Sequence, residues 1–69
     1  MGFAITVRRY CDYKMTYFVQ ETNEERAKQK AYQRAKETCN CYMPETLEEF
    51  ENNYFGDIEV DAKIDQIIL

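Results

Sequence analysis

The side chains that could carry chemistry in this chain are carboxylates, lysines, tyrosines and thiols, because serine, histidine and tryptophan are all absent. Without serine or histidine there is no serine triad, no Cys–His pair and no histidine general base or metal ligand. Two glycines, Gly2 and Gly56, are too few for a glycine-rich phosphate loop. We therefore expect a protein that is not an enzyme and that binds no cofactor.

The most enzyme-like arrangement is the triplet Asp61-Ala62-Lys63. It resembles the D-x-K half of the restriction-endonuclease-like nuclease motif, with Asp57 or Glu59 as further ligands for a divalent ion, since carboxylates suit Mg²⁺. The Pro-Asp element that precedes this half in the family is absent, and the family's fold is usually far larger. An alternating, solvent-facing strand is the simpler interpretation.

The three cysteines, Cys11, Cys39 and Cys41, are an odd number, which is a poor disulfide framework and fits a reducing compartment. A closed zinc site needs four ligands, so one chain without histidine predicts none, although a zinc bridging two chains is an alternative. We expect small, half-buried thiols. With no secretory signal and no run of roughly 20 apolar residues, the expected location is the cytoplasm.

Charge divides the chain into two halves of opposite sign. Residues 1–36 carry eight basic and four acidic side chains, whereas residues 37–69 carry nine acidic side chains and one basic side chain, Lys63. Two surfaces of opposite sign indicate interactions with partners and say little about the fold.

The elements that position these charges are predicted by periodicity. Alternation of apolar and polar residues predicts strands over 3–10, 15–20 and 58–65, and the last strand turns Ile58, Val60, Ala62 and Ile64 inward. A helix begins at Thr22, which forms a capping box with Glu25, and buries a stripe of Ala27, Ala31 and Ala35. Because alanines bury little area, Tyr32 or Thr38 is expected to widen this contact. A short second helix has Pro44 in its first turn and a second capping box, Thr46 with Glu49; it buries Leu47, Phe50 and Tyr54 and ends at Gly56-Asp57.

The predicted fold is a single α+β domain, 1–69, of order β-β-α-α-β: a three-stranded antiparallel sheet with both helices packed on one face. The third strand is expected beside the first, and a place beside the second strand is the alternative.

Two charged surfaces follow from this arrangement. The basic face of the first helix could contact nucleic-acid phosphates, but a pI of about 4.7 argues against nucleic-acid binding. The acidic surface could instead enter the phosphate-binding groove of another protein. The alternative is a surface that only keeps the protein soluble and prevents an exposed strand from pairing with other molecules. The basic face comprises Arg26, Lys30 and Arg34, and the acidic surface comprises Glu45, Glu48, Glu49, Glu59, Asp61 and Asp65.

The layout also resembles small proteins of phages and mobile elements. The opening Phe3-Ala-Ile-Thr-Val, the helix start Glu24-Glu25 with Ala27 and Ala31, and the strand Ile58-Glu-Val-Asp61 are similar in layout to DpnD/PcfM-like mobile-element proteins and to several anti-CRISPR proteins. This resemblance implies a non-enzymatic inhibitor that binds a CRISPR effector at a surface meant for nucleic acid, and it carries over no individual residue.

The sequence therefore favours a phage-type interaction protein that acts as a DNA mimic toward a protein partner in the host cytoplasm, with no membrane association and no metal. Nucleic-acid binding through the first helix is the alternative. A small oligomeric subunit, such as a homodimer joined through the aromatic residues Tyr17, Phe18 and Tyr42, is a third hypothesis.

Overall fold

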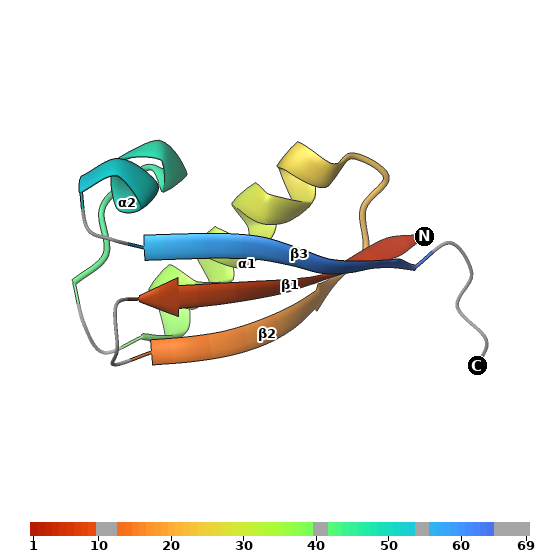
Figure 1. Ribbon diagram of the computed structural model, residues 1–69, viewed down its shortest axis with the longest axis horizontal. Helices are drawn as coiled ribbons and strands as arrows, with labels where there is room; N and C mark the ends of the chain where they lie inside the picture. The colour runs from red at the N-terminus through yellow and green to blue at the C-terminus, as the bar shows by residue number, and fades with distance from the viewer. Residues whose placement is uncertain (10–12, 40–41, 54–55, 65–69) are drawn as a thin grey trace.

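Three strands and two helices follow one another in the order β-β-α-α-β, with both helices on one face of the sheet (Figure 1). The computed structural model describes residues 1–9, 13–39, 42–53 and 56–64. This architecture confirms the α+β prediction. The elements are β1 (Gly2–Arg9), β2 (Tyr13–Val19), α1 (Glu24–Thr38), α2 (Leu47–Asn53) and β3 (Gly56–Ile64).

The strand order is β2-β1-β3, and both pairs are antiparallel. The third strand thus lies beside the first, as expected from a crossover in which the two helices act together. β1 is the central strand, and Ile5 pairs with Tyr17 on one side and with Val60 on the other. A central position explains why six successive residues of β1 are buried, although the strand alternates in polarity.

The core lies between the sheet and the helices. The predicted alanine stripe packs against the sheet, and Tyr32 is also fully buried, so its ring supplies the area that small alanines do not. The Tyr32 ring lies 5.0 Å from that of Phe50 between centroids, which joins α1 to α2. The main members of the core are Phe3, Ile5, Val7, Ala27, Ala31, Tyr32, Ala35, Met43, Leu47, Phe50 and Ile58.

The first helix begins one residue later than predicted, because Asn23 is its N-cap and Thr22 is not. The Asn23 side-chain oxygen accepts a hydrogen bond from the backbone N–H of Arg26 at 3.0 Å. An asparagine amide satisfies this helical donor as well as a threonine hydroxyl would. Thr22 is instead held by the side chain of Glu21, which accepts from its backbone N–H.

The second helix is capped as predicted, but its boundaries differ. The hydroxyl of Thr46 accepts from the backbone N–H of Glu49 at 3.2 Å, which is one half of the predicted capping box. Pro44 precedes the helix and is not in its first turn; its side chain is fully buried, and its carbonyl accepts from the Tyr32 hydroxyl. Gly56 does not end the helix but begins β3.

A β-bulge in β3 makes the predicted alternation wrong beyond Val60. Ile5 pairs with Val60 and Ala4 pairs with Ala62, so Asp61 is an extra residue opposite a continuous β1. An extra residue in a bulge shifts every later side chain to the other face of the sheet.

The consequence is that Ala62 and Ile64 do not turn toward the core. They lie across from Ala4 and Gly2, on the open face of the sheet, which is the face that the helices leave uncovered. Lys63 lies across from Phe3, on the helix-covered side, where it remains exposed at the sheet edge. The sequence pattern could not show this, because a bulge depends on how the strand pairs.

Cys39 forms a disulfide bond, which corrects the expectation of three free thiols. It lies directly after α1, where its backbone N–H closes the last turn on Ala35. An odd number of cysteines rules out a framework that uses all of them, but it does not prevent a single bridge. Cys11 and Cys41 lie outside the described residues.

Candidate protein-binding surface

The carboxylates that were predicted to form one surface lie on two. Glu45, Glu48 and Glu49 belong to α2 and the segment before it, which packs on the helix-covered side of the sheet. Glu59 and Asp61 lie on the open face, where Glu59 pairs across the ladder with Thr6. Asp65, the sixth predicted residue, is outside the described residues.

The helical group forms what we call the acidic helical surface, comprising Glu45, Glu48, Glu49 and Glu51. Leu47 and Phe50, which alternate with these carboxylates, are buried in the core and hold the short helix in place. Among the described residues none of the four carboxylates forms an ion pair with a lysine or arginine. Within the described part of the chain their negative charge is therefore not balanced by a basic side chain, and Glu45, Glu48 and Glu51 are exposed.

A cleft of about 370 Å³ separates this surface from the start of α1. Two of the acidic side chains, Glu48 and Glu51, line it from α2, and Glu25 lines it from α1. The amides of Gln29 and Asn52 complete its polar wall. Three carboxylates with neighbouring amide oxygens suit the long basic side chain of another protein, because an arginine fork or a lysine ammonium brings only donors. Within the described part of the chain no group of three or more histidine, cysteine, aspartate or glutamate side chains is arranged to hold a metal ion.

The carboxylates of the open face are different, because each has a partner within the domain. Arg8 on β1 reaches both Asp57, at 3.8 Å, and Glu59, at 3.9 Å. Asp61, the bulged residue, accepts a hydrogen bond from the hydroxyl of Thr6. Strand pairing thus satisfies the acids of β3 internally.

The bulge also bears on the nuclease-like triplet. In a regular strand Asp61 and Lys63 would lie on the same face, as the D-x-K arrangement requires. Here Asp61 bonds to Thr6 on the open face, whereas the register places Lys63 across from Phe3 on the helix-covered side. The two side chains therefore do not converge on a common point.

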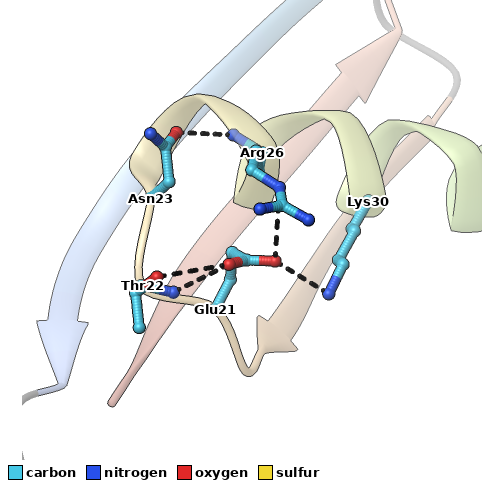
Figure 2. Close-up of polar contacts among 5 residues, drawn as sticks. All are labelled: Glu21, Thr22, Asn23, Arg26 and Lys30. Atoms are coloured by element: carbon cyan, nitrogen blue, oxygen red, sulfur yellow. Dashed lines mark hydrogen bonds and ion pairs between the residues drawn. The ribbon is translucent and has the colours of Figure 1, made fainter.

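The basic row of α1 is exposed, as predicted, but each of its residues has an acidic partner. Arg34 pairs with Glu37 at 3.3 Å, one turn along the helix. Lys30 and Arg26 both reach back to Glu21, in the connection between β2 and α1, at 2.9 and 3.9 Å (Figure 2). These pairs reduce the positive field that a nucleic acid would meet.

Glu21 is a residue that the sequence analysis missed. Its side chain is only 10% exposed and lies under the first turns of α1 (Figure 2). The hydrogen bond from Lys30 and then the one from the backbone N–H of Thr22 lower the pKa of the Glu21 carboxyl to about 2. Its position just before a helix with basic residues in its first two turns was the available signal. Glu21 anchors α1 to the end of β2.

The acidic helical surface also acts on the core through Tyr32. Burial, followed by electrostatic repulsion from Tyr42, Glu49 and Glu45, raises the pKa of the Tyr32 hydroxyl to about 12. The hydroxyl therefore stays protonated at neutral pH and donates to the carbonyl of Pro44. This bond fixes the segment that carries Glu45 against α1.

The aromatic residues proposed as an oligomer contact differ in exposure. Phe18 is 78% exposed and Tyr42 is also largely exposed, whereas Tyr17 is half-buried and shares a hydrogen bond of 3.2 Å with Thr38. Neither described helix has the length and apolar character needed to cross a bilayer.

No protein-family model matches this sequence, and no significant similarity is found to curated proteins or to solved structures.

Proposed function

We propose that this domain is a non-enzymatic binding protein that inhibits a nucleic-acid-handling protein by docking its acidic helical surface into a basic groove. The observation that carries the proposal is the contrast between the two sets of charges. Arg8, Arg26, Lys30 and Arg34 have acidic partners within the domain, whereas the carboxylates of the acidic helical surface have no basic partner among the described residues.

The mechanism is competition for a phosphate-binding site. A basic groove that binds a nucleic-acid backbone gains affinity from neutralising successive negative charges. Glu48 and Glu51 lie three residues apart on α2, where side chains at this spacing are neighbours, and Glu45 lies in the segment just before the helix, three residues before Glu48. A rigid acidic surface pays little ordering entropy on binding, and charge complementarity speeds its association with the groove.

The partner class follows from the same charge logic together with the layout of the chain. Any protein with a basic nucleic-acid groove meets the electrostatic requirement. A CRISPR effector in the host cytoplasm is the particular partner that the similarity in layout to anti-CRISPR proteins favours.

The test uses a purified, guide-loaded CRISPR effector and a fluorescently labelled sample of the domain. Binding should weaken as salt is raised and should be competed by target DNA. The triple variant Glu45→Gln, Glu48→Gln and Glu49→Gln removes three charges at nearly constant shape. We expect it to bind about tenfold more weakly or worse, from three exposed charge contacts of up to about 1 kcal/mol each.

The matched control removes three charges from the open face, in the variant Asp57→Asn, Glu59→Gln and Asp61→Asn. It should bind like the wild type, because those carboxylates are already partnered by Arg8 and Thr6. Unchanged binding and salt dependence in the helical variant would show that mimicry by this surface is wrong. A gel shift of DNA or RNA by the domain itself at low salt would favour the basic face of α1 instead.

A further inference from the structure

The outer edge of β2 is a second candidate surface for binding another protein chain. The strand order β2-β1-β3 leaves β2 paired on one side only within the described residues, and no helix or strand lies outside it in Figure 1. An edge strand presents unpaired backbone N–H and C=O groups that can pair with another strand. β2 is regular over its whole pairing with β1, from Tyr13 to Val19.

The two edges of the sheet are protected to different degrees. β3 carries a bulge and the acidic side chains of Asp57, Glu59 and Asp61, which are standard obstacles to edge-to-edge pairing. β2 has no bulge in its pairing with β1, and its only charged residue is Lys14. The unprotected edge is therefore β2.

Exposed apolar side chains accompany this edge. Phe18, on the open face, is 78% exposed, and Met15, on the helix-covered face, is 47% exposed. A small apolar hollow of about 110 Å³ adjoins Phe18 at one end of the sheet, where it is also lined by Phe3, Val19 and Ile64. Exposed apolar side chains thus lie on a strand that is at the edge of the described sheet.

We propose that β2 pairs antiparallel with β2 of a second copy of this chain, about a two-fold axis that passes beside Thr16. In this register Lys14 lies opposite Phe18 of the second copy, and Met15 lies opposite Tyr17 of the second copy. The side chains of each opposing pair lie on the same face of the sheet, since Lys14, Thr16 and Phe18 pair with Arg8, Thr6 and Ala4 on the open face. The acidic helical surface takes no part, so this inference is independent of the proposed function.

The charges of the chain favour a second copy of the chain as the partner of the β2 edge. The register places each lysine over an aromatic ring, a favourable cation–π arrangement. It also keeps the two copies of Lys14 roughly 13 Å apart, four residues along the strand, which exceeds the screening length in physiological salt. Pairing of β3 with a second β3 would instead bring two sets of carboxylates together. A two-fold dimer is closed, because it leaves an acidic β3 at both outer edges of a six-stranded sheet.

The experiment measures solution mass by sedimentation equilibrium over a range of concentrations, using the whole 8.3 kDa chain. We expect a reversible equilibrium between monomer and dimer. Phe18→Lys would place a lysine opposite Lys14 of the second copy, and Phe18→Glu would place a carboxylate there. Because the side chain of Phe18 is largely exposed, neither change disturbs the core, and circular dichroism verifies the fold.

The lysine variant should be monomeric, and the glutamate variant should still dimerise. The expected difference in dimer dissociation constant is about tenfold or more, because the pair occurs twice across the two-fold axis. Adding Lys14→Glu to Phe18→Lys should restore the dimer. A wild-type protein that is monomeric throughout, equal behaviour of the two variants, or a mass that grows beyond the dimer would each overturn the proposal.

Discussion

The replacement Gly56→Ala tests how tightly the second helix is packed against the start of β3. The single methyl group that it adds would overlap the Cε2, Cζ and Cδ2 atoms of the Phe50 ring. The ring has little room to move, because Phe50 is fully buried and packs against Tyr32. Gly56 is thus required for space, and its backbone is not in the left-handed region that would itself demand glycine.

Two opposing terms set the size of the effect. Alanine restricts the unfolded chain, which alone would stabilise the protein by about 0.4–1 kcal/mol. Overpacking a fully buried aromatic ring costs about 1–3 kcal/mol, so the net expectation is a loss of about 1–2 kcal/mol. For a domain of this size that corresponds to a melting temperature lower by about 5–15 °C. The loss is substantial, because a 69-residue domain has a total stability of only about 3–10 kcal/mol.

The assay is urea denaturation of four proteins: the wild type, Gly56→Ala, Phe50→Leu and the double variant. Leucine removes most of the ring that the new methyl group meets, so the double variant should be more stable than the sum of the single losses by about 1 kcal/mol or more. If Gly56→Ala stabilises the protein, or if the two losses simply add, Phe50 does not occupy that space and the reasoning is refuted.

Three further perturbations test other contacts. Tyr32→Phe removes the hydroxyl that donates to the buried carbonyl of Pro44, so the free energy of unfolding measured in urea should fall by about 1–3 kcal/mol. Because folding raises the pKa of Tyr32 from 10 to about 12, wild-type stability should fall as the pH rises through this range, and the phenylalanine variant should lose that dependence. Folding lowers the pKa of Glu21 from 4.5 to about 2, so the contribution of Glu21 to stability is complete above pH 4.5 and is lost as the pH falls toward 2. The stability of Glu21→Gln should therefore depend less on pH over this range than that of the wild type, and equal slopes would argue against the Lys30 contact. A reductant should lower the thermal midpoint of the wild type but not that of Cys39→Ala, whereas an unchanged wild type would show that the disulfide does not contribute to stability.

Much of the fold could be read from local patterns. The alanine stripe of α1, the Thr46 cap of α2 and the placement of Phe3, Ile5 and Val7 on the core side of β1 each depend on residues a few positions apart, and all three are present in the structure. The start of α1 was misplaced because two adjacent residues, Thr22 and Asn23, are both competent caps. Which of the two residues caps the helix depends on the other hydrogen bonds that each can form, and Thr22 is hydrogen-bonded to the carboxylate of Glu21.

The candidate site was predicted less completely. The helical carboxylates Glu45, Glu48 and Glu49 lie together as expected, whereas Glu59 and Asp61 lie on the other face of the sheet with internal partners. The reason is that a list of acidic positions carries no information about which basic or hydroxyl side chains will pair with them. Arg8 and Thr6 are more than 45 positions away from the acids that they contact.

The sequence by itself determined the secondary-structure elements, their order and the apolar stripes that become the core, because these follow from hydrophobic periodicity and from capping over short distances. Only the tertiary structure decided three other features: the bulge at Asp61, the anchoring of α1 by Glu21 and the disulfide at Cys39. Each of them depends on strand register or on contacts across the fold. The same strand pairing decided which carboxylates of β3 contact Arg8 or Thr6 within the domain.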